Sequence, residues 1–386
     1  MEFSKRAQSI MPSPTLAITS KAKKMKEAGE DVVNFAAGEP FFDTPDQVKQ
    51  AAIEAIQQGF TKYTPTAGAS FLKKVICQKF KNDNYLHYDE DQIVVSCGAK
   101  HSLFNIMQVL CDVGDEVIFS APYWVSYPEM VKFAGGQPVV IKTLEKNDFK
   151  FKAETLEKYI TDKTKILILN SPSNPTGAIY TQEELEEIAE VVIKNDLYVI
   201  SDEIYEKIIY NGKKHVSIAS LGKDIYKRTI TVNGVSKAYS MTGWRIGYLG
   251  AVEAIATKIS NLQSHSTSNP ASISQKAAYA ALICDESIIR NMVSEFDIRR
   301  KLIVKGLDSI KGFSCNLPDG SFYCFCNIKE TGMNSMDLTN KLLNEQKIAV
   351  IPGIVFGQEY YLRISFSCDI EQIEKGIARL REAFAS

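Results

Sequence analysis

One lysine lies among small residues, eight positions before an arginine, in the stretch Asn233-Gly234-Val235-Ser236-Lys237-Ala238-Tyr239-Ser240-Met241-Thr242-Gly243-Trp244-Arg245-Ile246-Gly247. Lysine becomes a covalent nucleophile when desolvation or a neighbouring cation lowers its pKa, and it can then bond to an aldehyde. Arg245 would suit a phosphate group, and the three glycines would let the backbone approach a bulky ligand. Taken alone, the run suits a solvated loop equally well, so the rest of the chain has to decide.

The composition is that of an ordinary globular protein, with 45% hydrophobic and 24% charged residues. A length of 386 residues predicts a large domain with a smaller partner, or two domains of equal size. The net charge, 45 − 46 = −1, offers no excess for a nucleic-acid backbone or an anionic membrane, so small-molecule partners are expected. No apolar run approaches the ~20 residues that cross a bilayer, and the start lacks the apolar core of a signal peptide, which predicts a cytoplasmic location.

The cysteines and histidines do not predict a metal site. Eight cysteines are scattered through apolar stretches, and we expect free thiols. Cys324 and Cys326 share one face of a predicted strand, where packing in the core is the favoured interpretation. None of the four histidines lies at ligand spacing from another, so zinc chemistry is not expected.

Short apolar runs separated by helical stretches predict an α/β fold with a mostly parallel sheet and helices on both faces. The predicted strands are residues 93–95, 116–119, 138–141, 165–169, 197–200 and 229–232. The predicted helices between or beside them are residues 100–111, 123–134, 181–194 and 253–262. Ligands of such sheets bind beyond the carboxyl ends of the strands, so the residues that follow each strand are the candidates for a site.

Three segments make up the predicted domain organisation. Residues 1–45 form an N-terminal arm and part of a small domain, with a helix from Thr19 to Gly29. Residues 46–285 form the large domain. Residues 286–386 complete a small α+β domain, beginning with a long amphipathic helix at 286–310.

Polar side chains follow two of the predicted strands. Asn174 lies in a proline-rich turn after strand 165–169, where it could donate a hydrogen bond or serve only the turn. Asp202 directly follows strand 197–200, with Tyr205 three residues later. A carboxylate beside a pyridine nitrogen keeps that nitrogen protonated, and the cationic ring can then accept electrons. The alternative for Asp202 is the N-cap of a helix.

Two other strand ends carry further candidates. The turn Gly98-Ala99-Lys100 follows strand 93–95 and opens a helix whose free backbone amides could hold a phosphate. Trp124 follows strand 116–119 and could stack on a planar ligand or fill the core. Near the C-terminus, Arg363 lies inside an apolar strand, where its planar guanidinium matches the carboxylate of an amino acid or a buried ion pair.

Together these residues resemble fold-type I pyridoxal-phosphate enzymes over nearly the whole chain. The 233–247 stretch resembles the cofactor-attachment signature of class I and II aminotransferases. The resemblance is greatest to the bacterial aspartate aminotransferase branch, through Pro12-Ser13-Pro14-Thr15, Ala37-Gly38-Glu39-Pro40, Tyr123-Trp124-Val125-Ser126-Tyr127-Pro128 and Met241-Thr242-Gly243-Trp244-Arg245-Ile246-Gly247-Tyr248.

The resemblance implies a role for each matching residue. It implies that Lys237 forms the Schiff base with pyridoxal 5′-phosphate and moves the substrate proton, and that Asp202 pairs with the ring nitrogen. The remaining implied cofactor contacts are Tyr205 and Asn174 at the 3-oxygen, Trp124 on the ring, and Arg245, Ser236, Ala99 and Lys100 at the phosphate. Tyr63 is implied to reach the phosphate of a second subunit, which predicts a homodimer with its active sites at the interface.

The resemblance also implies the substrate contacts. The α-carboxylate would be held by Arg363 with Gly38, Trp124 and Asn174. The distal carboxylate of a dicarboxylic substrate would be held by Lys100 and Thr15. Some relatives use prephenate with the help of an arginine in the arm, but Met11 stands at that position here. Gly234 stands where many relatives place a phosphate-binding serine, so Ser236 or a water could take over that contact.

The predicted function is ping-pong transamination between L-aspartate, or another amino acid, and 2-oxoglutarate. The nearest alternatives are an aminotransferase for prephenate, aromatic amino acids or alanine, and a pyridoxal-phosphate-dependent C–S lyase. A ligand-sensing regulator is disfavoured because no segment has the character of a DNA-binding module.

Overall fold

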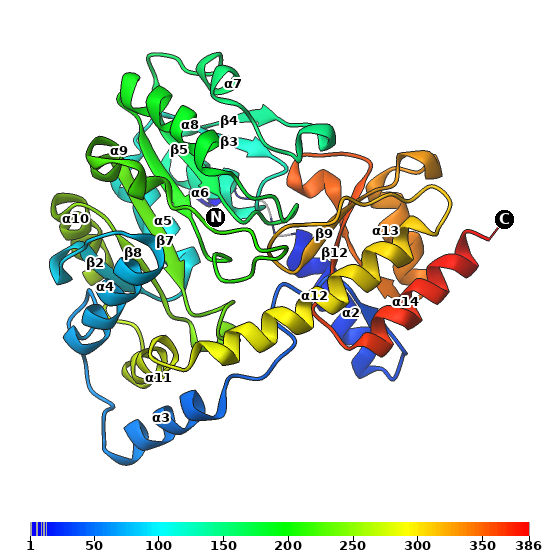
Figure 1. The fold of residues 1–386 in the computed structure, drawn as a ribbon, viewed down its shortest axis with the longest axis horizontal. Helices are drawn as coiled ribbons and strands as arrows, with labels where there is room; N and C mark the ends of the chain where they lie inside the picture. Colours follow the sequence, from blue (N-terminus) through cyan, green and yellow to red (C-terminus); the bar gives the residue numbers. More distant parts are fainter. Residues whose placement is uncertain (1, 5–6, 9, 11, 13, 386) are drawn as a thin grey trace.

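A seven-stranded sheet forms the centre of the larger part of the molecule, in the order β2-β8-β7-β6-β5-β3-β4 (Figure 1). The computed structural model describes residues 2–4, 7–8, 10, 12 and 14–385. The strands of this sheet are β2 Ile93–Ser96, β3 Glu116–Ala121, β4 Gln137–Lys142, β5 Thr164–Asn170, β6 Tyr198–Asp202, β7 Thr229–Gly234 and β8 Gly247–Gly250. All run parallel except β8, which pairs antiparallel with both of its neighbours. The predicted α/β class and each of the six predicted strands are confirmed.

Helices cover both faces of the sheet because successive residues of its strands face opposite sides. Ile166 and Ile168 of β5 pack into one core with α5, α6 and α10, whereas Leu167 and Leu169 pack into a second core with α7 to α9. The helices of this part are α3 Asp46–Gln57, α4 Ser70–Asn84, α5 Ala99–Leu110, α6 Ser126–Ala134, α7 Ala153–Glu157, α8 Gln182–Lys194, α9 Lys223–Arg228, α10 Glu253–Ser264 and α11 Ser272–Leu282. Strand β5 is therefore apolar on both sides, as its continuous run predicted, whereas β7 has the apolar Ile230 and Val232 on one side and the buried polar Thr231 and Asn233 on the other.

The two ends of the chain pack together beside this sheet. The short strand β1 Val33–Asn34 pairs in parallel with β10 Ile348–Ala349, and β11 Ile351–Pro352, β12 Tyr361–Ser365 and β9 Tyr323–Asn327 form an antiparallel sheet. The helices of this part are α2 Pro14–Glu27, α12 Glu286–Asp308, α13 Ser335–Glu345 and α14 Ile370–Ala383. In Figure 1, α12 runs from the neighbourhood of α11 to α14. The boundaries at residues 45 and 285 stay a prediction.

Several elements differ from the sequence-based expectation. The helices α4, α7, α9 and α11 and the strand β8 were not predicted, and α2 begins at Pro14 where a start at Thr19 was expected. Strand β8 consists of four residues with glycine at both ends, which is too short and too glycine-rich for an apolar run to be recognised. Within the part of the chain that the structure describes, no helix is long and apolar enough to cross a membrane.

Candidate active site

A cavity of about 390 Å³ opens at the carboxyl ends of the parallel strands. It receives side chains that follow β2, β3, β5, β6 and β7, together with residues from the N-terminal arm and β12. All sequence-predicted site residues except Tyr63 line it: Thr15, Gly38, Ala99, Lys100, Trp124, Asn174, Asp202, Tyr205, Ser236, Lys237, Arg245 and Arg363. The rule that ligands bind beyond the strand ends therefore located the cavity correctly.

Lys237 lies just beyond β7, with its amine deep in the cavity. Burial first, and then the nearby Arg363 guanidinium, lower the pKa of Lys237 to about 8. The Nζ donates to the backbone oxygen of Gly38 and lies 5.8 Å from the centre of the Tyr205 ring. A larger fraction of this amine is therefore neutral near pH 7 than for a solvated lysine, as a nucleophile requires.

Asp202 ends β6 and is only 4% exposed. Burial raises the pKa of its carboxyl to about 6, although the hydroxyl of Tyr127, which donates to Oδ2 at 2.7 Å, acts in the opposite direction. A buried acid of this kind becomes fully ionised when a cation approaches it. Tyr127 was not predicted as a site residue; its position three residues after Trp124, in the first turn of α6, was the available signal.

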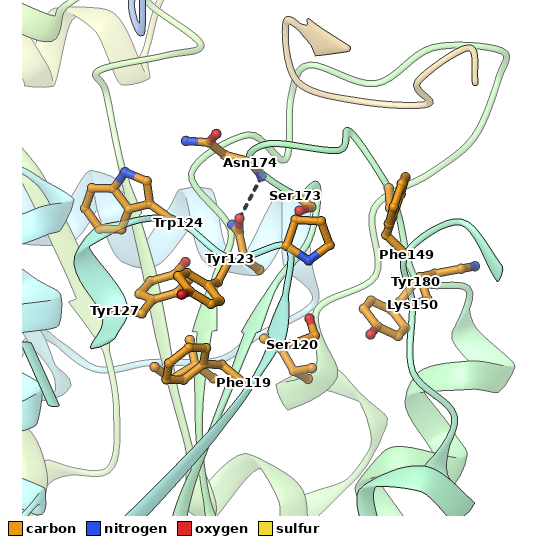
Figure 2. A pocket seen from close by; sticks show the side chains of 15 residues that line it. Phe119, Ser120, Tyr123, Trp124, Tyr127, Phe149, Lys150, Ser173, Asn174 and Tyr180 are labelled. Carbon is orange, nitrogen blue, oxygen red and sulfur yellow. Dashed lines mark hydrogen bonds between the residues drawn. The ribbon is translucent and has the colours of Figure 1, made fainter. Parts of the chain in front are cut away.

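Two turns are tied together beside this carboxylate. The backbone amide of Asn174 donates to the side chain of Asn170 at 2.8 Å, and the Asn170 amide donates to the backbone oxygen of Asp202 at 3.0 Å. Figure 2 shows Asn174, Trp124 and Tyr127 around a smaller pocket that shares Trp124 and both asparagines with the main cavity. The predicted residues at 174 and 202 are thus parts of one hydrogen-bonded unit.

The Tyr205 hydroxyl also has a partner that sequence analysis did not predict. It lies 3.1 Å from the hydroxyl of Tyr323, and both rings are buried. Tyr323 begins β9 and lines the cavity. Its signal in the sequence was only an aromatic residue in an alternating strand, which is typical of core packing.

One end of the cavity is cationic. Gly98, at φ +89°, precedes α5, and a Cβ there would overlap Nη2 of Arg245. Gly247 is equally constrained, because a Cβ would overlap the backbone nitrogen of Ala99. Close approach thus places Arg245 beside the first amides of α5, which attract anions. Gly243 is different, because no protein atom lies within 4 Å of an added Cβ there.

Arg363 lies in the central strand of the antiparallel sheet and is 4% exposed. Its Nη2 donates to the backbone oxygen of Ala36 at 2.9 Å and its Nη1 to Oδ1 of Asn174 at 3.3 Å, while its buried Nε has no partner. No carboxylate of the described residues pairs with it. The alternative of a structural ion pair is therefore wrong, and the guanidinium remains available to an anionic ligand.

Lys100 and Thr15 face the cavity from α5 and α2. The Nζ of Lys100 lies 4.9 Å from the centre of the Trp124 ring, and burial, with a smaller contribution from Arg245, lowers the pKa of Lys100. Tyr63 is 92% exposed and lines no part of this cavity. Met11 lies outside the described residues.

The fold and the lysine-containing site define a family that comparison with known proteins identifies. The model of the family "Aminotransferase class I and II" matches residues 30–380. An aspartate aminotransferase of Bacillus subtilis is 47% identical, covering 99% of this chain and 98% of its own length. A probable aspartate/prephenate aminotransferase of Rickettsia conorii is also 47% identical, over 98% of both chains.

Solved structures agree. The aspartate aminotransferase of Thermus thermophilus with maleate superposes with a TM-score of 0.96 at 38% identity, over 99% of both chains. The chain belongs to the class I and II aminotransferases.

Proposed function

We propose that this chain is a pyridoxal-phosphate-dependent aspartate aminotransferase, which transfers the amino group between L-aspartate and 2-oxoglutarate in a ping-pong reaction. The observation that carries the proposal is the presence, in one cavity, of an amine with a lowered pKa at Lys237 and of a guanidinium without a carboxylate partner at Arg363. The first group suits covalent chemistry with an aldehyde, and the second suits the α-carboxylate that every amino acid carries.

The residues present fit pyridoxal phosphate. Arg245, Ser236 and the first amides of α5 form a cationic, hydrogen-bonding end that would hold the phosphate, while Asp202 lies in the same cavity and would pair with the ring nitrogen. Tyr205 and Asn174 would bind the 3-oxygen, and Trp124 would stack on the ring. When bound, the cofactor supplies an aldehyde that takes up the amino group and a protonated ring that accepts an electron pair.

Two residues would then act on the amino acid, and a third would act on the cofactor ring. Arg363 would orient its α-carboxylate with two parallel hydrogen bonds, which fixes the Cα–H bond relative to the ring. The Nζ of Lys237 would take the proton from the α-carbon, for which an amine with a pKa of about 8 is well matched near neutral pH. Asp202 would remain ionised beside the ring cation, because a neighbouring positive charge opposes the effect of burial.

A second group of anion-binding side chains in the cavity favours a dicarboxylic substrate. Lys100 and Thr15 line the cavity, and they would bind a distal carboxylate. Maleate, which accompanies the Thermus enzyme in its solved structure, is itself a dicarboxylate. Prephenate is the second candidate, because the relative from Rickettsia conorii carries that name. Rates with aspartate, phenylalanine and alanine as amino donors to 2-oxoglutarate, and with prephenate as the acceptor of the amino group of aspartate, distinguish these substrates.

We also propose a homodimer in which Tyr63 reaches the cofactor phosphate of the partner subunit. A tyrosine that is 92% exposed, and that follows the exposed apolar residues Ile53 and Ile56 of α3 in the sequence, suits an interface better than solvent. Light scattering of the purified protein tests this: a mass of twice 43.0 kDa is expected, and a monomer of 43.0 kDa would contradict it.

The decisive experiment removes the amine. Lys237→Ala should keep its fold and thermal stability but lose the half-reaction with aspartate by a factor of about 10⁴ or more, followed by the absorbance of the bound cofactor. Lys150→Ala, at another largely buried lysine, is the control and should keep full activity. Borohydride should attach the cofactor to Lys237 in the wild type. Attachment elsewhere, or a normal half-reaction in the variant, refutes the proposal.

A further inference from the structure

A buried ionic cluster lies on the other side of the turn that carries Asp202 and Tyr205. Among the described residues, Glu203, Glu206 and His215 form the one group whose potential metal-ligating atoms all lie within 4.8 Å of one another. Lys79 already supplies a cation there, since its Nζ pairs with Glu206 and donates to Oδ1 of Asn84 at 2.7 Å. Two buried carboxylates with an internal ammonium and a histidine are compensated without a metal.

Glu203 is the centre of this cluster. It is 1% exposed, and each of its oxygens accepts two hydrogen bonds. Oε1 accepts from the hydroxyls of Ser201 and Ser217, both at 2.7 Å, and Oε2 accepts from His215 Nε2 at 2.8 Å and Asn84 Nδ2 at 3.0 Å. Burial lowers the pKa of His215, but the Glu203 carboxylate outweighs this effect, and the pKa of His215 is raised above its ordinary value. The raised pKa favours a protonated imidazole as one of the four donors, and a hydrogen bond from a charged donor is stronger than one from a neutral donor.

The same residue determines the path of the backbone between the two cavity residues. The Glu203 amide donates to the backbone oxygen of Val232 in β7 at 2.9 Å, and its carbonyl accepts from the Glu206 amide at 2.9 Å. Asp202 and Tyr205 line the cavity, whereas Glu203 and Glu206 do not. The turn 202–206 thus presents one set of side chains to the cavity and the other set to the buried cluster.

We propose that Glu203 is a positioning residue for the transamination: held by its four donors, it fixes the turn 202–206 and with it the directions of Asp202 and Tyr205 toward the cavity. This inference rests on the proposed function. Groups that hold a reacting constellation act through geometry, since a displacement of about 1 Å can reduce a rate about a hundredfold. Glu203 itself contacts neither substrate nor cofactor.

The test compares two holoenzyme variants that both lose a buried charge. Glu203→Ala should lower kcat with aspartate about tenfold or more while KM changes less than about twofold, because Arg363 and Lys100 are untouched. The absorbance of the bound cofactor should also titrate with a displaced midpoint. Arg299→Leu is the control: Arg299 is 6% exposed, bonds Glu295 and the backbone oxygen of Cys368, and does not line the cavity. Arg299→Leu should lower the melting temperature but leave kcat and the midpoint of the absorbance titration unchanged.

A milder variant keeps the test valid if Glu203→Ala does not fold. Ser217→Ala removes one of the four donors and should lower kcat about two- to fivefold and displace the same midpoint in the same direction. Unchanged kcat and midpoint in Ser217→Ala, or a Glu203→Ala enzyme that matches Arg299→Leu, would overturn the inference. Failure of the proposed function is distinguishable, because the wild-type holoenzyme would then show no half-reaction with any amino acid.

Discussion

Arg363 and Arg300 are both buried, at 4% and 0% exposure, yet their surroundings differ completely. Arg300 has a protein partner for each nitrogen: Nε donates to Asp297 at 2.8 Å, Nη1 to the backbone oxygen of Pro318 at 2.6 Å, and Nη2 to Asn211 at 2.9 Å. Arg363 has no carboxylate among the described residues, and its Nε has no partner at all.

This difference separates a residue that stabilises the fold from one that binds a ligand. A buried guanidinium without an anion costs free energy, and that cost is recovered only when an anion arrives. The Arg363 guanidinium can therefore bind the carboxylate of a ligand, whereas every nitrogen of the Arg300 guanidinium already has a hydrogen-bond partner in the protein. Substitutions at the two positions should have opposite consequences, and that expectation can be tested directly.

Of the two arginine substitutions, Arg363→Leu is expected to have the larger effect on catalysis. Losing the partner of the substrate α-carboxylate should lower kcat/KM for aspartate about a thousandfold, or about 4 kcal/mol. The free energy of unfolding should stay the same or rise, because an uncompensated buried charge is removed. Steady-state kinetics and urea unfolding measure the two quantities. A large loss of stability with kcat/KM retained would show that Arg363 is structural after all.

Arg300→Leu should behave in the opposite way. It leaves Asp297 without its buried cation and removes the guanidinium that lies 4.4 Å from the centre of the Tyr210 ring, so the free energy of unfolding should fall by about 3 kcal/mol. The kcat/KM of the folded fraction should stay within about twofold of the wild type, because Arg300 does not line the cavity. A thousandfold loss of kcat/KM with an unchanged free energy of unfolding would show that Arg300, like Arg363, contributes to ligand binding.

Lys100→Met extends the comparison to the other end of the substrate. Methionine keeps the length of the side chain and removes its charge, so KM for aspartate should rise about tenfold, or about 1.4 kcal/mol. The kinetics with alanine, which has no distal carboxylate, should change little and serve as the internal control. Equal losses for aspartate and alanine would assign Lys100 to the cofactor phosphate instead.

The fold and the cavity were largely predictable because both follow from local patterns. Short, continuous apolar runs such as residues 165–169 are typical of buried parallel strands, and the residue after each strand lies at the edge where parallel strands end. Asp202 was identified for that reason, whereas Lys237 was identified from the small residues around it and the arginine eight positions later. Strand β8 was missed because its pairing depends on neighbours far away in the sequence, with glycines that allow the close approach.

The partners of the predicted residues could not be predicted in the same way. Tyr127 and Tyr323 resemble ordinary core aromatics in the sequence, and only the tertiary structure brings their hydroxyls to Asp202 and Tyr205. The cluster around Glu203 joins residues more than one hundred positions apart, for which no spacing rule exists. Local sequence therefore predicts which side chains reach a strand end, while the groups that orient them depend on long-range packing.

The smallest expected effect concerns the acid of the cavity and is visible without cofactor. Burial raises the pKa of Asp202 from 3.8 to about 6, so the stability contributed by its protonated form is complete below 3.8 and is lost as pH rises through 6. Asp202→Asn lacks this titration. Between pH 5 and 7, cofactor-free wild type should therefore lose about 1 kcal/mol of unfolding free energy relative to the variant.

Urea unfolding of both proteins across this pH range measures the difference, and because His215 is present in both, its own titration cancels. Tyr127→Phe sharpens the test: losing the hydrogen bond to Oδ2 should raise the pKa of Asp202 further and move the loss of stability to higher pH. Parallel curves for wild type and Asp202→Asn would mean that this carboxyl is ionised throughout. The Asp202 carboxylate would then be stabilised by groups of the protein itself, as the Arg300 guanidinium is. It would not depend on a cationic ligand in the way that Arg363 depends on an anionic one.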